Sequence, residues 1–214
     1  MDMDLSVWKG GPRPERITLE GRYVRIEPLD PRRHGDDLYA ATMAPGVEER
    51  LRYLTVHPPA WLEDYSSDPN KLAFATIDKR TNRAEGRQAL RNIDPVHGVI
   101  EVAMMWGPAI ARTRVATEAV FLFASYVFDE LAYRRFVWRA NNLNEPSKRA
   151  ATRFGFVYEG VLRQLKVIKA QNFDAACYAM LDADWLRLKP GYERWLCPRN
   201  FDEDGTQKTK LKFD

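Results

Sequence analysis

The sequence has few of the residues on which disulfide-stabilised, metal-binding or membrane-spanning proteins depend. Its 214 residues include two cysteines, Cys177 and Cys197, which form no C-x-x-C pair and are typical of reduced thiols inside a cell. The three histidines lie far from metal-ligand spacing, so we expect no metal site. The most apolar runs, 102–111 and 119–128, have about ten residues each, whereas a membrane span needs roughly 20. We therefore expect a cytoplasmic protein.

Net charge is also small. Thirty-three Lys and Arg residues against 30 Asp and Glu residues give +3 at neutral pH. This excess of positive charge is too small to create an electrostatic field that attracts nucleic acids, so we expect neither a nucleic-acid nor a membrane partner. The apolar fraction of 45% and the charged fraction of 29% are those of a globular protein. A chain of this length buries about two thirds of its unfolded surface and needs no cross-link to fold.

The sequence pattern predicts strands and helices in a mixed order, which favours an α+β or α/β class. A strand–helix–strand unit over 99–140 needs a crossover, so its two strands are expected to be parallel. The expected strands are 23–29, 72–77, 86–93, 99–106, 135–140, 156–162 and 167–181. The expected helices are 31–43 after an Asp30 cap, 61–65, 117–131, 144–154, and a last one through Trp195 capped by Asp182 or Asp184.

The segment 107–116 links a strand to the strongest predicted helix. Free N–H groups at a helix N-terminus form a ready anion site, and Arg112 and Arg114 add positive charge there. Thr113 and Thr117 add hydroxyl groups. Two interpretations remain open at this point: a cradle for a pyrophosphate, or an ordinary capped loop with two solvated arginines.

Six motifs, each weak alone, occur in an order that resembles a known family. They are Ile-Glu-Val-Ala-Met-Met-Trp-Gly-Pro at 100–108, Val-Ala-Thr-Glu-Ala at 115–119, Asn144 with Ser147, Phe-Gly-Phe at 154–156, Glu159-Gly160 with Arg163, and Asp174 with Asp184-Trp185. Together they resemble the GCN5-related N-acetyltransferases (GNAT), most closely the branch of ribosomal-protein N-terminal acetyltransferases. The resemblance covers roughly 17–185. It leaves 1–16 as an N-terminal arm and 186–214 as a helical extension with a polar tail.

The resemblance implies an α+β fold with a mostly antiparallel sheet that is splayed in the middle and flanked by helices. It implies that acetyl-CoA lies in the opening and donates its acetyl group to a primary amine. Backbone N–H groups of Val102, Ala103 and Met104 would bind the pantetheine and the thioester carbonyl. Ser147 would lie near the sulfur. The other implied cofactor-binding residues are Asn144 and, around the pyrophosphate, Ala111, Arg112, Thr113, Arg114, Val115 and Ala116.

The sequence departs from the family pattern in three places. The phosphate loop usually reads Gln/Arg-x-x-Gly-x-Gly/Ala, and here Ala111 replaces the first residue and Arg114 the glycine. Glycine admits backbone conformations that arginine resists, so Arg114 either binds phosphate directly or weakens the site. Many relatives have a tyrosine as general acid where this chain has Ala151. A usual Gly-Tyr pair is Ala103-Met104, which predicts a drier and fuller acyl pocket.

The acceptor amine must be neutral to attack a thioester. A lysine amine with a pKa of about 10.4 is neutral in roughly one part in two thousand at pH 7, a penalty of about 4.6 kcal/mol, whereas an α-amine with a pKa of about 7.7–8.0 loses only about 1 kcal/mol. A site without a strong base therefore favours an α-amino acceptor: a peptide, a free amino acid, or an amine-bearing metabolite or antibiotic.

Glu101 is the candidate base, acting through a water. Alternation along its strand places it on the opposite face from Ile100 and Val102. The alternative is a strand carboxylate paired with Arg91 or Arg87.

Two further functions stay open from the sequence. The altered loop and the Ala103-Met104 pair also suit another acyl donor, such as a longer acyl-CoA or an acyl-tRNA. A non-catalytic CoA- or RNA-binding protein is the other alternative, supported weakly by four arginines over 80–91 and three lysines over 208–212. The oligomeric state is expected to be a monomer or a homodimer.

Overall fold

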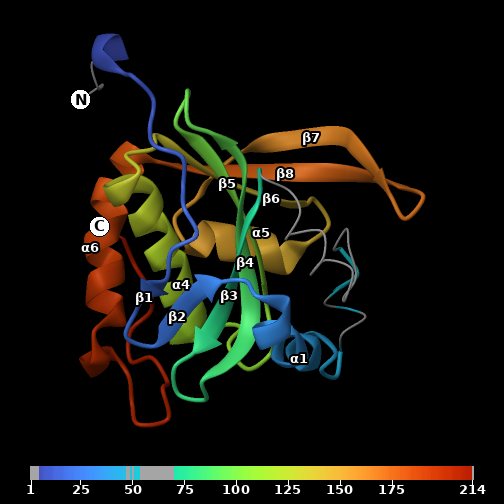
Figure 1. The fold of residues 1–214 in the computed structure, drawn as a ribbon, viewed down its shortest axis with the longest axis vertical. Helices are drawn as coiled ribbons and strands as arrows, with labels where there is room; N and C mark the ends of the chain where they lie inside the picture. Colours follow the sequence, from blue (N-terminus) through green and yellow to red (C-terminus); the bar gives the residue numbers. More distant parts are fainter. Residues whose placement is uncertain (1–4, 47–48, 50, 54–69, 214) are drawn as a thin grey trace.

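The described residues form one twisted sheet with helices packed on both faces. The computed structural model describes residues 5–46, 49, 51–53 and 70–213. In these residues eight strands lie in the order β1-β2-β3-β4-β5-β6-β8-β7, and every neighbouring pair is antiparallel except β5 and β6 (Figure 1). The strands are β1 (Leu19–Glu20), β2 (Val24–Pro28), β3 (Leu72–Asp78), β4 (Arg83–Asp94), β5 (Val99–Trp106), β6 (Arg135–Asn141), β7 (Val157–Ile168) and β8 (Gln171–Leu181). This mixed, mostly antiparallel sheet confirms the predicted α+β class.

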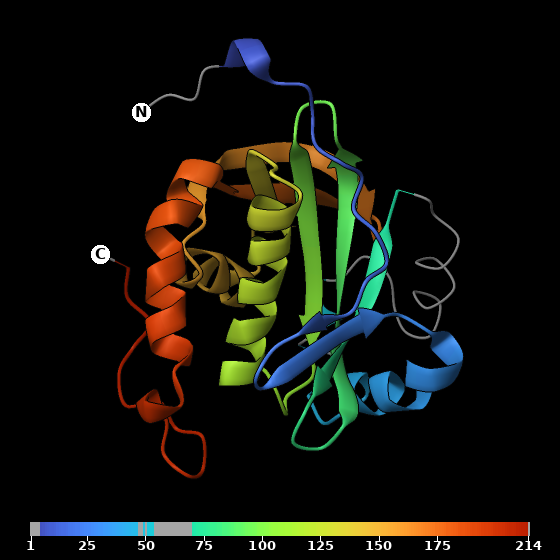
Figure 2. The ribbon, with the colours of Figure 1, turned by 60° about the vertical axis from the view of Figure 1, so that its left-hand side comes forward.

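Helices cover the two faces of the sheet unequally. On one face α1 (Pro31–Thr42) packs against β4 and contributes Leu38 to a small apolar cluster. On the other face α4 (Arg114–Ser125), α5 (Glu145–Arg153) and α6 (Asp182–Leu196) share the main core, in which Phe123 and Trp185 are fully buried. Figures 1 and 2 show α4 and α6 side by side on this face. None of the helices within the described residues is long and apolar enough to cross a membrane.

The centre of the sheet divides. β5 and β6 are paired over four positions, from Val99 opposite Arg135 to Val102 opposite Trp138. Beyond them β5 continues along β4 as far as Trp106, and β6 continues along β8 as far as Asn141. The edge of β5 that faces β6 is therefore unpaired from Ala103 onward in the described chain. This is the splay that the resemblance implied, and it leaves backbone groups free to bind a ligand.

Helix α4 is held to the N-terminal strands by one buried carboxylate. Glu118 is 5% exposed and accepts hydrogen bonds from the backbone N–H groups of Arg22, Tyr23 and Val24, at 2.9, 2.6 and 2.9 Å. A buried carboxylate is tolerated only when donors surround it, and here the turn between β1 and β2 supplies them. The contact fixes the start of β2 against α4.

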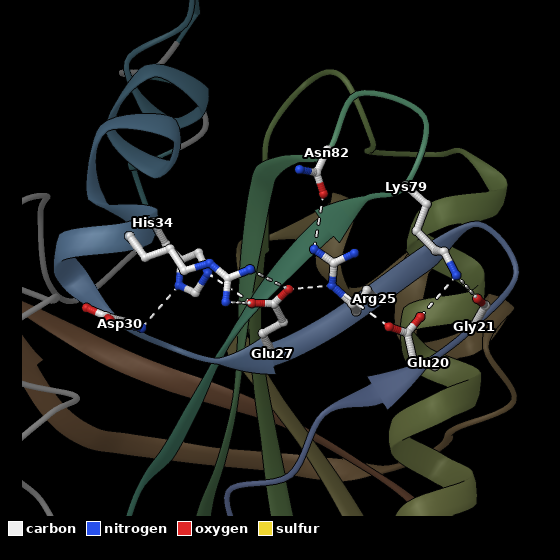
Figure 3. Close-up of polar contacts among 9 residues, drawn as sticks. Glu20, Gly21, Arg25, Glu27, Asp30, His34, Lys79 and Asn82 are labelled. Atoms are coloured by element: carbon white, nitrogen blue, oxygen red, sulfur yellow. Dashed lines mark hydrogen bonds and ion pairs between the residues drawn. The ribbon is translucent and has the colours of Figure 1, made fainter.

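A second buried cluster holds α1 to the edge of β2 (Figure 3). Glu27 on β2 is 5% exposed, and the guanidinium groups of Arg25 and Arg33 both contact its carboxylate. His34, 3% exposed, accepts a hydrogen bond from the Asp30 N–H at Nδ1, and its Nε2 lies 3.4 Å from Glu27 Oε2. Burial alone would raise the pKa of Glu27, but the bond and charge of Arg25, with the charge of Arg33, hold it below its usual value. Burial lowers the pKa of His34, and this outweighs the attraction of Glu27.

Most predicted elements are confirmed, with corrections at their ends. Helix α4 begins at Arg114, three residues before the predicted start, and a π-helical turn, η2 (Tyr126–Glu130), replaces its last turn. Strand β7 extends to Ile168, and a turn at Lys169 and Ala170, both at positive φ, closes the hairpin. Alternation predicted a shorter strand because a bulge between Leu162 and Lys166 breaks the period of two. The predicted helix at 61–65 lies outside the described residues.

The end of the chain packs onto the domain. Phe213 packs against Tyr192 of α6, and the Trp195 Nε1 donates to the Thr209 carbonyl at 2.9 Å. Helix α6 begins at Asp182 after Leu181, while Asp184 accepts the Leu181 N–H at 3.1 Å rather than standing at the cap itself. The proposed domain boundary at residue 185 stays a prediction, and α6 runs through it.

The His34 cluster predicts an acid-sensitive fold. Because burial lowers the pKa of His34, the unfolded chain binds the proton more readily, and the free energy of unfolding falls as the pH drops below about 6.5. We expect His34→Asn to reduce the pH dependence of the free energy of unfolding. Between pH 7.5 and 5.5 the slope should fall by at most about 1.4 kcal/mol per pH unit. Urea denaturation at both pH values measures it. The exposed His97→Asn is the matched control, and equal slopes for the two variants would contradict the prediction.

Candidate active site

The parting of β5 and β6 opens a cleft of about 530 Å³ through the sheet. Its walls are β4, β5, β6, the start of α5 and the β7–β8 hairpin. Side chains alternate across the sheet, so the cleft has two chemically different mouths. Met104 and Trp138 pack with the α4 core, and Ser147 of α5 lies on this side. Glu101 and Arg139 lie on the opposite face, the one that α1 covers.

Glu101 is the most enclosed charge in the cleft, with 2% of it exposed. Its Oε1 accepts hydrogen bonds from Nε of Arg91, at 2.9 Å, and from Nη2 of the same guanidinium. Its Oε2 accepts from the Asn92 amide at 2.7 Å and lies 3.1 Å from Nε of Arg139. A carboxylate offers about four acceptor sites, so these contacts use most of the hydrogen-bonding capacity of Glu101. The sequence left two interpretations of Glu101 open, a general base or a carboxylate paired with an arginine. The structure shows the pairing, with Arg91.

Ser147 lies at the other mouth, near the start of α5. The helix begins at Glu145 after the cap residue Asn144, whose side chain accepts the Ser147 N–H at 3.1 Å. The Ser147 Oγ accepts the indole N–H of Trp138 at 3.0 Å. Because Oγ is already an acceptor, its own proton remains to be donated. The hydroxyl is thus held in one place with a hydrogen bond to give.

The loop before α4 forms a separate anion cradle. The N-cap Thr113 accepts the Val115 N–H at 3.2 Å and donates its hydroxyl to the Ile110 carbonyl at 2.7 Å. In the described chain no acceptor faces the N–H groups of Arg112, Arg114 and Ala116. Unsatisfied N–H groups at the positive end of a helix are what a phosphate requires. The cradle therefore fits the predicted pyrophosphate.

The two arginines of this loop have different surroundings. The guanidinium carbon of Arg114 lies 4.4 Å from the ring centre of Tyr23 and 5.2 Å from that of Phe201, so this side chain packs on aromatic rings. Arg112 is exposed and adopts the left-handed backbone conformation, with φ of 65°. Only the backbone of Arg114 therefore faces the cradle, and Arg112 is the cation available to an anion there.

The structure brings half of the predicted site residues to the cleft. Glu101, Val102, Ala103, Met104, Asn144 and Ser147 all line it. Residues 111–116 do not line it and lie beyond the end of β5. Sequence reasoning missed Arg139 and Lys166. Arg139 could have been found, because alternation along its strand places it on the Glu101 face two residues past Val137, which pairs with Glu101.

Comparison with known proteins decides the family. The model of the acetyltransferase (GNAT) domain matches residues 30–157, more than half of the chain. The chain belongs to the GNAT acetyltransferase family. A crystal structure of a GCN5-related N-acetyltransferase from Brucella melitensis is 49% identical, covers 97% of both chains and has a TM-score of 0.93. A GNAT-family structure from Chromobacterium violaceum is 33% identical over 86% of this chain and 96% of its own, with a TM-score of 0.79.

A curated relative matches over a shorter stretch. YdaF of Bacillus subtilis, provisionally named a ribosomal N-acetyltransferase, is 27% identical over 100 residues. The match covers 47% of this chain and 55% of YdaF, so the chain spans about half the length of this relative. These comparisons confirm the predicted family, and GNAT acetyltransferases generally use acetyl-CoA.

The cradle predicts different roles for the two arginines of this acetyltransferase. We expect Arg112→Ala to weaken CoA binding about three- to tenfold, because one charge-assisted contact to phosphate is lost. Arg114→Ala should change the affinity less than about twofold and lower the melting temperature instead, because a stacked guanidinium contributes about 0.5–2 kcal/mol. Titration calorimetry with CoA and with 3′-dephospho-CoA measures both effects. An Arg112 effect confined to CoA would assign this arginine to the 3′-phosphate rather than to the pyrophosphate.

Proposed function

We propose that this protein transfers the acetyl group of acetyl-CoA directly to a primary α-amine. The observation that carries the proposal is the two-mouthed cleft: a hydroxyl donor, Ser147, on the α5 side and a charged cluster around Glu101 on the other. The phosphates would lie in the cradle at residues 111–116. The thioester would lie beside β5 at Val102, Ala103 and Met104, where the pairing with β6 ends at Val102 and the edge of β5 becomes unpaired.

The chemistry needs no covalent enzyme intermediate. The neutral amine nitrogen forms a bond to the thioester carbon and the carbon–sulfur bond breaks. The amine proton passes, directly or through water, to the departing thiolate, so the products are an amide and a thiol. The departing thiolate belongs to a thiol with a pKa of about 8.5, so it leaves without a strong acid. Ser147 stabilises it with one hydrogen bond. Ala151 stands where many relatives have a tyrosine acid. Ser147 lines the cleft beside Trp138 and is the hydroxyl donor that we assign to the thiolate, and Tyr53 also lines the cleft.

The acceptor follows from the surroundings of Glu101. Its oxygens are engaged by Arg91, Asn92 and Arg139, so a proton must displace one of these contacts before Glu101 acts as a base. An amine with a substantial neutral fraction at pH 7 lessens this requirement, and an α-amine, with a pKa of about 7.7–8.0, has that property. The name of YdaF makes a peptide N-terminus the first acceptor to test.

The role of Glu101 follows from the same contacts. As a positioning residue, it holds the guanidinium groups of Arg91 and Arg139 at the acceptor mouth. The earlier prediction of a general base stays a prediction, and a variant separates the two roles.

Ligand binding and turnover test the proposed function together. Acetyl-CoA at about 100 times its dissociation constant should add roughly 2.7 kcal/mol to the native state, a rise of about 5–10 °C in melting temperature. Thiol release with an N-terminal peptide should follow. The same measurements with a longer acyl-CoA test the identity of the donor. If the longer acyl-CoA gave a larger rise in melting temperature and faster thiol release, it would take the place of acetyl-CoA as the proposed donor. No shift with any CoA thioester would overturn it.

The variant Glu101→Gln distinguishes positioning from base catalysis. Loss of a general base costs about 10²–10⁴-fold in rate. We expect kcat to fall less than about tenfold, KM for the acceptor to rise, and the pH profile to keep following the acceptor amine. Steady-state kinetics from pH 6 to 9 measures this. A fall in kcat above about a hundredfold, with a flattened profile, would make Glu101 the base.

A further inference from the structure

The acceptor mouth carries an excess of positive charge. Among the described residues that line the cleft, five are cations and one is a carboxylate, Glu101. The cations are Lys71, Arg87, Arg91, Arg139 and Lys166. Lys71 and Arg87 interact with other groups of the protein, which leaves Arg91, Arg139 and Lys166 as the cations considered for a ligand. In the described part of the cleft these three cations and one carboxylate therefore lie together where an acceptor would enter.

The internal ion pairs do not neutralise this charge. Arg91 and Arg139 share one carboxylate, so the three groups together keep a positive charge. Arg139 meets Glu101 only through Nε, and no acceptor for its two Nη groups occurs in the described chain. The side chains of Arg91 and Arg139 are 31% and 34% exposed, so a ligand can reach them. Lys166, on the hairpin wall, is exposed.

The donor does not account for these cations. Its phosphates have their own cradle at residues 111–116, none of which lines the cleft. Arg91 and Arg139 lie on the α1 face with Glu101, whereas α4 and its N-terminus lie with the main core on the other face. The cations are thus separated from the phosphates by the sheet.

Resting on the proposed function, we propose that the acceptor is an amine that carries its own carboxylate a few bonds from the amino group. Arg139 and Lys166 bind this carboxylate, and Glu101 orients Arg139 for it. Guanidinium groups match carboxylates through paired N–H donors, which gives orientation as well as affinity. The same cations disfavour an ammonium group, so they favour the neutral amine that reacts. A basic amine without a carboxylate is rejected by both effects.

Pairs of acceptors that differ by one carboxylate test the proposal. Alanine against alaninamide examines a free amino acid, and an Ala-Glu peptide against its Ala-Gln counterpart examines an acidic N-terminus. An Ala-Lys peptide is the basic acceptor. We expect kcat/KM, corrected for the neutral fraction of each amine, to favour the carboxylate in one pair by about tenfold or more. The pair that responds identifies the source of the carboxylate.

Variants link this preference to the residues. Arg139→Gln should reduce the preference at least about threefold, by raising KM for the carboxylate acceptor, and leave the acetyl-CoA affinity unchanged. Lys166→Gln, an exposed site independent of Glu101, should do the same and cannot act by unfolding a buried pair. Arg80→Gln, with a side chain 77% exposed on the β3–β4 turn, removes the same charge elsewhere and should keep the preference.

The outcomes separate the two proposals. Equal rates for acidic, neutral and basic acceptors, or a preference that both cleft variants leave intact, would overturn the carboxylate acceptor and leave amine acetylation standing. Acetylation of no amine in the panel would overturn the proposed function, and the acceptor class with it.

Discussion

The parting of β5 from β6 is the constraint on which the rest of this structure depends. Each strand is held on its outer side by an antiparallel partner, β4 or β8, and the two share only the four pairs that end at Val102 and Trp138. Beyond that point neither strand can close the gap without breaking its outer ladder. An unpaired backbone edge inside a folded domain requires a partner. The cleft opens at this unpaired edge, which is why we propose it as the site.

A buried carboxylate organises the acceptor side of the opening. Glu101 is 2% exposed, and a charge so enclosed is stable only with donors on every side. Arg91, Asn92 and Arg139 are those donors, and they come from strands on both sides of the parting. The groups that stabilise Glu101 thereby become a fixed array of cations at the mouth. In our proposal, the contacts that stabilise Glu101 also position the cations that bind a ligand.

The loop before α4 accommodates an arginine where the family pattern usually has a glycine. Arg114 takes the position of a usual glycine, yet it lies in regular α-helix, and its side chain packs on Tyr23 and Phe201. The left-handed conformation occurs instead at Arg112, two residues earlier. The C-terminal extension supplies Phe201, so the altered loop and the added segment belong together. Neither alternative considered from the sequence, a phosphate ligand or a weakened site, included this contact.

The sequence by itself determined the order and type of most elements, the family, and the residues that line the cleft at 101–104, 144 and 147, because local periodicity, capping and motif spacing are written in neighbouring residues. It could not determine that Arg91, Asn92 and Arg139 together surround Glu101, that His34 is buried beside Glu27, or how Arg114 packs. Those contacts join residues from separate strands and from the chain end, and they arise only when register and helix packing bring distant segments together. Tertiary structure alone decided that Arg139 and Lys166 lie in the cleft with Glu101.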